Sequence, residues 1–208
     1  MRFTFKTTFI ALALCGSASL WAAPPMADPT VEELVRALGT SAVSKAFNGG
    51  FRRTAAPDRN HFCPEVSSSM GNSYGATGRK NLEVVPYDGG HAVSADLALH
   101  FALGSDKLDA SDRNILDTLV LALRDPRLAN GRFAIAGHTD ASGSAQTNLQ
   151  LSCARAISAR AYLIQNGISG ERLSAYGFGS DRLLDAANPW SAVNRRVEIR
   201  RDLDTNGR

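Results

Sequence analysis

The hydrophobic pattern divides this chain of 208 residues near residue 93. Before that point, one short stretch has helical spacing: Thr30 is a typical helix-start residue, and Val31, Leu34, Val35 and Leu38 follow at intervals suited to one helix face. The next stretch, up to about residue 90, is rich in Gly, Ser, Asn and Pro, a composition typical of linkers and irregular structure. We therefore expect one amphipathic helix and little other regular structure before residue 93.

From residue 93 onwards the pattern predicts a regular succession of strands and helices. Residues 94–103 alternate between apolar and other side chains, which predicts a strand with one buried face. Apolar spacing predicts helices over residues 108–126 and 144–168, and short apolar runs predict strands at 132–137, 172–179 and 194–200. This order implies an α/β layer structure with parallel crossover units, and it allows the last strand to run antiparallel at an edge.

The helix predicted over residues 144–168 places an arginine on the side that should be buried. On a helical wheel Arg155 shares a face with Asn148, Ser152 and small apolar residues. A buried arginine is costly unless it meets an anion, and the loop before this helix supplies Asp140. In one interpretation Asp140 pairs with Arg155 or with neighbours and fixes the loop. In the other, the two stand apart across a cleft, where Asp140 takes a cationic group and Arg155 a carboxylate, and the site recognises a zwitterion.

Several short motifs in this half of the chain follow one another in a characteristic order. They are Thr139-Asp140, Gly143, Asn148, Leu151-Ser152, Arg155-Ala156 and the closing run Asn194 to Ile199. Further matches are Phe101, Leu108, Gly167-Ile168 and residues 172–179. Together they resemble the OmpA-like C-terminal domain, a peptidoglycan-binding module of bacterial envelopes, over residues 93–201.

The resemblance implies a fold and a ligand. The fold is α/β (an α+β sandwich of βαβαβ(β) order), in which a mixed four-stranded sheet packs on helices, preceded by a short helical and irregular N-terminal region. The ligand is the diaminopimelate residue of the peptidoglycan stem peptide, bound without a covalent bond. Asp140 would meet its ammonium or a nearby amide, and Arg155 its carboxylate.

Other positions follow from the same resemblance. Thr139, Ser142, Asn148 and Arg195 match positions that help line the site, whereas Arg196, the next residue along the last strand, should point to the opposite face. The chain departs from the family pattern at Gly104, Leu183 and Cys153. None of these departures changes Asp140 or Arg155.

Other classes of function find little support in the sequence. The net charge of +3 is too small to predict nucleic-acid binding. The four histidines are scattered, and the chain has neither a GxSxG elbow nor an HExxH motif. His138 directly follows a short strand and is expected to be structural. The sequence therefore predicts no enzyme, metal or cofactor. The alternative to peptidoglycan binding is a periplasmic protein–protein interaction module that has kept the fold and lost the ligand.

The start of the chain predicts export. Arg2 and Lys6 precede a short apolar run, and small residues then allow cleavage before Pro24. We expect an export signal at residues 1–23, an N-terminal helix and irregular region at 24–92, and an OmpA-like domain at 93–203. The protein should lie in the periplasm or at the outer membrane, with peptidoglycan and other envelope proteins as partners. A competing interpretation has Cys15 end a lipoprotein cleavage box and carry an acyl anchor.

Export also bears on the cysteines. The chain has three, and Cys15 lies within the predicted signal. Cys63 and Cys153 then remain in an oxidising compartment. The sequence leaves open whether these two cysteines form a disulfide or remain unpaired thiols.

Overall fold

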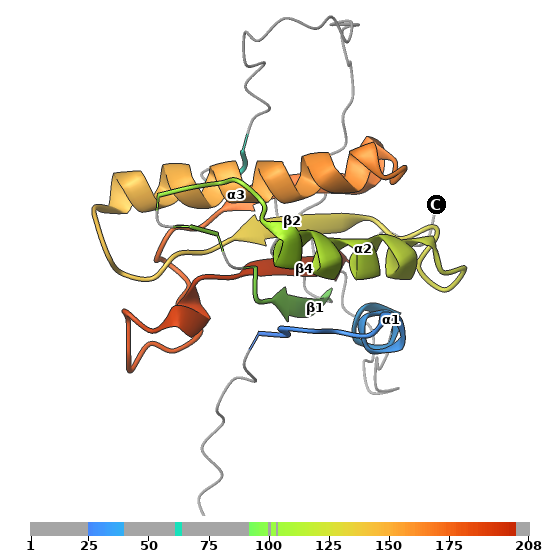
Figure 1. Cartoon of the computed structure of the whole chain (residues 1–208), viewed down its shortest axis with the longest axis horizontal. Coiled ribbons are helices and arrows are strands. Elements are labelled where there is room, and N and C mark those ends of the chain that lie inside the picture. Colours follow the sequence, from blue (N-terminus) through green and yellow to red (C-terminus); the bar gives the residue numbers. More distant parts are fainter. Residues whose placement is uncertain (1–24, 40–60, 64–91, 100, 103, 203–208) are drawn as a thin grey trace, which may run out of the picture.

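The computed structural model describes residues 25–39, 61–63, 92–99, 101–102 and 104–202 (Figure 1). The predicted export signal, with Cys15, and most of the irregular region lie outside these ranges. None of the helices described in them combines the length and hydropathy that a membrane span requires. The main elements are α1 (Val31–Gly39), β1 (Ala92–Leu97), α2 (Ala110–Arg124), β2 (Phe133–Gly137), α3 (Ala145–Gln165), β3 (Leu173–Gly177) and β4 (Val197–Asp202).

The four strands form one mixed sheet in the order β1-β4-β2-β3. The predicted mixed four-stranded sheet is thereby confirmed. The crossover from β2 through α3 joins two parallel strands as expected, and β4 runs antiparallel to both of its neighbours. The position allowed for the last strand, at an edge, is wrong. β4 lies in the interior of the sheet because β1 pairs with one side of it and β2 with the other.

β1 ends earlier in the sequence than the alternating pattern predicted. It stops at Leu97 instead of continuing to residue 103. Leu97 pairs with Val197, the first residue of β4, so the sheet offers no partner beyond this point. The following segment leaves the sheet, and the carbonyl groups of Ala102 and Ser105 accept hydrogen bonds from α3 instead.

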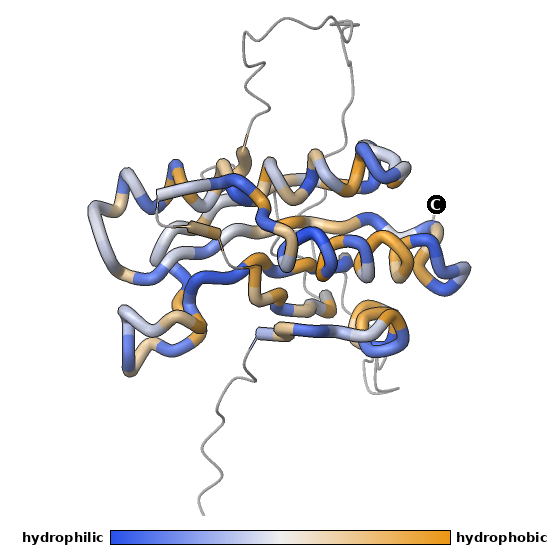
Figure 2. The backbone as a smooth tube through the Cα atoms, viewed as in Figure 1, coloured by the Kyte–Doolittle hydropathy of each residue, from blue (hydrophilic) through white to orange (hydrophobic). Residues whose placement is uncertain are grey.

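The main core lies between one face of the sheet and the three helices. Alternate strand residues point into it, among them Leu97, Phe133, Ile135, Val197 and Ile199. α1 lies beside β1 (Figure 1). It is amphipathic, with both hydrophobic and hydrophilic residues along its length (Figure 2), and it buries Leu34, Val35 and Leu38 in this same core. The N-terminal helix is thus packed into the domain that the sequence pattern started at residue 93.

A capping box at the start of α2 allows a test of how much this local structure contributes to stability. Asp109 accepts a hydrogen bond from the backbone N–H of Asp112 at 2.8 Å, and the Asp112 carboxylate accepts one from the backbone N–H of Asp109 at 3.1 Å. Because this capping box satisfies two otherwise unpaired backbone donors, Asp109→Ala should lower the free energy of unfolding by about 1 kcal/mol. Chemical denaturation measures the change. Ser111→Ala, which removes a hydroxyl that donates to Asp109 but no backbone partner, is the control and should have a smaller effect.

Candidate functional site

The segments that carry the predicted site residues meet at one end of the sheet, on the left in Figure 1. Gly137 ends β2, Leu97 ends β1, and both pair with Val197 at the start of β4. The chain therefore leaves β1 and β2, and enters β4, at the same end. Asp140 lies between β2 and α3, Arg155 lies on α3, and Arg195 lies two residues before the start of β4.

Asp140 is held by one hydrogen bond at each carboxylate oxygen. The backbone N–H of Ser142 donates to Oδ1 at 3.0 Å, and Nη1 of Arg195 donates to Oδ2 at 2.7 Å. Burial acts to raise the pKa of Asp140, but the hydrogen bonds from Arg195 and Ser142 outweigh it and hold the pKa below its ordinary value. Asp140 is thus a carboxylate at neutral pH, paired with a neighbour and not with Arg155.

Arg155 has a different environment, with no carboxylate in contact with its guanidinium within the described part of the chain. Its Nε donates to the carbonyl oxygen of Ser105 at 3.0 Å, and its Nη2 to that of Ala102 at 3.3 Å. The guanidinium carbon lies 5.0 Å from the centre of the Phe101 ring. Backbone carbonyls and an aromatic face therefore hold this cation in place of a counter-ion.

The electrostatics at Arg155 follow from this arrangement. The residue is 4% exposed. Burial and the nearby charge of Arg195 lower the pKa of Arg155, whereas the charge of Asp140 acts in the opposite direction. An arginine side chain remains protonated in proteins even so. The charges of Asp106 and Asp112 also act to raise the pKa of Arg155, although no carboxylate in the described part of the chain contacts its guanidinium.

A pocket of about 240 Å³ opens beside the two arginines. Its lining residues are Arg155, Arg195, Pro25, Ala98, Leu99, Phe101, Ala192 and Val193. Asp140 does not line it directly and is connected to it through Arg195. Cations beside apolar walls suit an anion that carries an aliphatic chain.

Sequence reasoning did not assign the apolar lining of this pocket. Phe101 stood in the alternating pattern and among the family matches, but nothing marked its ring as a contact of Arg155. The sequence gives no sign that Pro25 lines the pocket, because its position depends on the pairing of the next residue, Met26, with β1. Met26 forms a single bridge to Leu97, and its backbone exchanges hydrogen bonds with Asp96 and Ala98.

The other predicted residues lie around Asp140. The Asn148 side chain is buried, and its Nδ2 donates to the backbone oxygen of Asp140 at 3.2 Å. The backbone N–H of Thr139 donates to Gly179 at 2.8 Å, while its buried hydroxyl makes no hydrogen bond within the described residues. Asn148, Ser142 and Thr139 thus fix the loop that carries the carboxylate.

Comparison with known proteins bears on this site. The model of the OmpA family matches residues 100–196, a range that contains Asp140, Arg155 and Arg195. The chain carries a domain of the OmpA family.

Relatives of the OmpA-family domain have names from the bacterial envelope. The peptidoglycan-binding protein ArfA of Mycobacterium bovis is 34% identical over 112 residues, which are 52% of this chain and 34% of ArfA. The peptidoglycan-associated lipoprotein of Pseudomonas putida is 32% identical over 114 residues, which are 53% of this chain and 66% of the lipoprotein. The chain therefore spans about a third of the length of ArfA.

Solved structures also resemble the chain. The OmpA-like domain of FopA1 from Francisella tularensis subsp. tularensis SCHU S4 matches with a TM-score of 0.46 and 23% identity. That match covers 52% of this chain and 71% of the FopA1 chain. The peptidoglycan-associated lipoprotein from Burkholderia pseudomallei matches with a TM-score of 0.43 and 23% identity, over 52% of this chain and 89% of that chain.

Two further polar residues of the OmpA-family domain make internal contacts. Nε of Arg196 lies 2.6 Å from Oδ1 of Asp96. His138 is 1% exposed, and its Nε2 lies 3.4 Å from a carboxylate oxygen of Glu198. Burial lowers the pKa of His138, although Glu198 acts in the opposite direction. Such an enclosed, neutral imidazole does not face the pocket. In the described ranges, no three residues among His, Cys, Asp and Glu are grouped so as to hold a metal ion.

The depressed pKa of Asp140 predicts how the stability of the OmpA-family domain depends on pH. A carboxyl group whose folded-state pKa is lowered stabilises the fold above its unfolded-state value of about 3.9, and this contribution disappears as the pH falls through the lower folded value. The difference in unfolding free energy between wild type and Asp140→Asn should be constant from about pH 5 to pH 8 and shrink below about pH 4. Urea denaturation across this range measures it. A difference that grows on acidification would contradict the assigned charge state.

Proposed function

We propose that this OmpA-family domain binds peptidoglycan without a covalent bond, through the diaminopimelate residue of the stem peptide. The observation that carries the proposal is the buried guanidinium of Arg155, which borders a pocket and contacts no carboxylate in the described part of the chain. A ligand carboxylate would supply the missing counter-ion. Hydrogen bonds between charged groups are about twice as strong as neutral ones, so this contact would contribute strongly to affinity.

The second half of the proposed contact is Asp140. The far end of a diaminopimelate side chain carries an ammonium and a carboxylate on the same carbon, so its two charges need opposite partners close together. In the described part of the chain, the backbone of Ser142 donates to one oxygen of Asp140 and Arg195 to the other, and a carboxylate has about four lone-pair sites. An ammonium can therefore bind Asp140 without displacing Arg195. Arg155 and Arg195 then receive the ligand carboxylate.

The apolar walls of the pocket agree with this ligand. The two amino-acid ends of diaminopimelate are joined by three methylene groups. Phe101, Leu99 and Val193 offer apolar surface next to the cations. Burial of the methylene groups there would contribute about 0.8 kcal/mol for each group removed from water.

The proposed cellular role is attachment to the cell wall. The names of ArfA and of the peptidoglycan-associated lipoproteins support peptidoglycan binding by domains of this family. We infer that the OmpA-like domain, proposed to extend over residues 93–203, acts by binding and not by catalysis. With an export signal at residues 1–23, the protein would lie in the periplasm or at the outer membrane and link that layer to the wall, with other envelope proteins as further partners.

Sedimentation with purified peptidoglycan tests the proposal. The wild-type protein should pellet with sacculi of the diaminopimelate type, whereas folded Asp140→Ala and Arg155→Ala should stay in solution. Asp117→Ala is a matched control, since this carboxylate lies on α2, where it accepts a hydrogen bond from Tyr162. If both site variants pellet like the wild type, the assigned site is wrong. If the wild type does not pellet, an interaction module without peptidoglycan binding is favoured, and release of soluble fragments would indicate an enzyme.

A further inference from the structure

The outer edge of β3 is covered by a short piece of the N-terminal region. β3 is the last strand of the sheet, with β2 on its other side. Residues His61–Cys63 pair with it antiparallel around a bridge between Phe62 and Tyr176. The backbone N–H of Cys63 donates to Ala175 at 3.0 Å, and that of Gly177 donates to His61 at 2.9 Å. These three residues, which we call the edge cover, extend the sheet beyond β3.

Side chains of the edge cover add two ring contacts. Phe62 meets Tyr176 edge to face with ring centres 5.7 Å apart, and His61 stacks on Phe178 at 4.6 Å. Nε2 of His61 also lies 3.2 Å from the carboxylate of Asp181. The cover therefore shields both the backbone edge and part of the apolar cluster on the sheet face opposite the helices.

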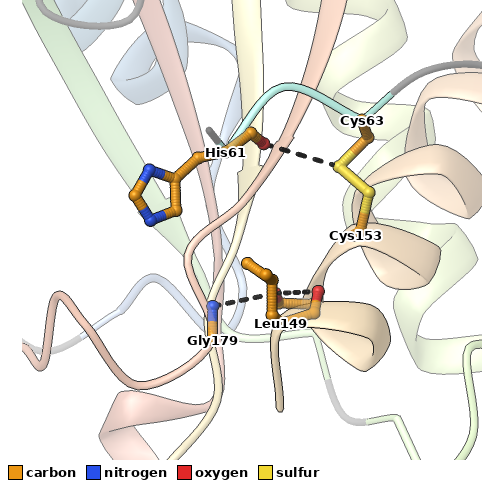
Figure 3. Close-up of a disulfide and its surroundings, with 6 residues drawn as sticks. His61, Cys63, Leu149, Cys153 and Gly179 are labelled. Carbon is orange, nitrogen blue, oxygen red and sulfur yellow. Dashed lines mark hydrogen bonds between the residues drawn. A yellow bond between two sulfur atoms is a disulfide. The ribbon is translucent and has the colours of Figure 1, made fainter. Parts of the chain in front are cut away.

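A disulfide attaches the edge cover to α3. Cys63 is bonded to Cys153, with 5.7 Å between their Cα atoms and 90 residues between them in sequence (Figure 3). The Cys63 sulfur lies 3.8 Å from the carbonyl oxygen of His61. This contact is not a hydrogen bond, because a disulfide sulfur carries no proton. Two backbone hydrogen bonds contribute only about 0.5–1.5 kcal/mol each. The covalent bond is thus the strongest link between the cover and the domain.

The sequence of β3 explains why this edge needs to be covered. Leu173–Gly177 reads LSAYG and contains no charged residue and no proline. Exposed edge strands usually carry such residues, because an unprotected edge pairs with strands of other molecules. Here the protection comes from His61–Cys63 instead. Its covalent attachment to α3 depends on the Cys63–Cys153 bond, which a reductant can break.

We propose that Cys63–Cys153 is a redox-controlled lock on this edge, and that reduction frees β3 to pair with β3 of a second copy of the chain. The reductant is a dithiol. Its thiolate attacks the sulfur of Cys153, which is less buried than Cys63, and the Cys63 thiolate leaves with the cover. A second thiolate resolves the mixed disulfide. Two electrons and two protons pass to the protein, and the dithiol becomes a disulfide.

Symmetry favours a second copy as the partner. The edge cover pairs with β3 antiparallel, and two β3 strands related by a twofold axis also meet antiparallel. The uncharged edge brings no like charges together in such a pair. The second strand would take over hydrogen bonds at the backbone of Ala175 and Gly177 that the cover makes in the oxidised chain.

Hydrogen exchange and light scattering test the lock on the full chain. In the oxidised protein the Gly177 amide should exchange slowly, and the mass should be that of a monomer at every concentration. After reduction with dithiothreitol, the same amide should exchange at least about tenfold faster at low concentration. At high concentration it should become protected again while the mass doubles. Cys63→Ser/Cys153→Ser should behave like the reduced protein, provided that circular dichroism shows the fold intact.

Two results would overturn the lock. One is equal protection of Gly177 in the oxidised and reduced forms. The other is a reduced protein that exposes this amide and stays monomeric at all concentrations. If the double variant fails to fold, reduction of the folded wild type gives the same comparison. Sedimentation with peptidoglycan should be unchanged by reduction, because the contacts described for the edge cover are with residues 175–181 and Cys153, and not with Asp140 or Arg155. Failure of the lock and failure of the proposed function are therefore distinguishable.

Discussion

Replacement of Arg155 with glutamine should weaken binding of diaminopimelate-type peptidoglycan at least about 30-fold, with little change in fold. The ligand carboxylate would enter a pocket next to a buried cation whose contacts among the described residues are backbone carbonyl groups and a ring. Without this guanidinium, the same carboxylate would lose its solvent and keep as a charged partner only Arg195, which also pairs with Asp140. Removal of one member of a buried charge pair costs about 2–5 kcal/mol. Titration of the variant with soluble muropeptide, followed by calorimetry, gives the dissociation constant.

Arg160 provides a matched control on the same helix. It is also buried, and it also donates to backbone carbonyls, through Nε to Leu173 at 2.9 Å and through Nη2 to Gly170 at 3.0 Å. Arg160→Gln and Arg155→Gln should therefore lose similar amounts of stability, about 1–3 kcal/mol each. Only Arg155→Gln should lose affinity. If both variants bind alike, Arg155 is a structural residue and the proposed ligand contact is wrong.

Gly137→Ala should lower the free energy of unfolding by about 3 kcal/mol or more. A methyl group at this position would overlap the backbone carbonyl oxygen of Ser152 on α3. Backbone cannot move aside as a flexible side chain can, so the helix has to shift away from the sheet. Such a shift would also displace Arg155, one turn further along α3, and weaken ligand binding. Urea denaturation and muropeptide titration of the same variant measure the two effects.

Gly39→Ala is the control for this prediction. At Gly39 a methyl group would lie 3.8 Å from the Leu128 side chain, which is ordinary contact. The substitution should leave stability unchanged or raise it by up to about 1 kcal/mol, because alanine has the better helix propensity. A Gly137→Ala variant as stable as the Gly39→Ala variant would show that α3 does not pack as closely on β2 as described.

Local patterns were sufficient to predict the helices and most of the sheet. The spacing of Leu116, Leu119 and Leu123 marks the buried face of α2, since helix periodicity depends on nearby residues alone. The position of β4 within the sheet could not be predicted from local patterns. Which strand lies in the interior of this sheet depends on pairing between residues 60 to 110 positions apart, and the sequence of β4 alone does not show which strands pair with it.

The candidate site was predictable to a similar degree. Asp140 and Arg155 stood out because a carboxylate in a glycine-rich loop and an arginine on a buried helix face are unusual. The pair that Asp140 forms, with Arg195, was not predicted, because those residues are 55 positions apart and meet only when β4 lies beside β2. The carbonyl groups that hold Arg155 belong to the backbone, and their position has no side-chain signature.

The contacts of the N-terminal region left no signal in its composition. Met26, which precedes α1, and Phe62, which lies in the stretch rich in Gly, Ser, Asn and Pro, each form a single bridge at opposite edges of the sheet. One paired residue leaves no alternating pattern to detect. Cys63 was the one signal for such contacts, and the sequence left its pairing open.

A titration with two tripeptides tests the central claim most directly. At the far end of the side chain of its third residue, L-Ala-γ-D-Glu-meso-diaminopimelate carries an ammonium and a carboxylate, whereas the matching lysine peptide carries the ammonium alone there. By NMR, the diaminopimelate peptide should shift the Nε–H signal of Arg155 and the amide signal of Ser142 at one site per chain. The lysine peptide should bind at least about 30-fold more weakly. Equal binding of the two peptides, or shifts confined to residues away from Arg155 and Asp140, would contradict a site built for a doubly charged amino acid.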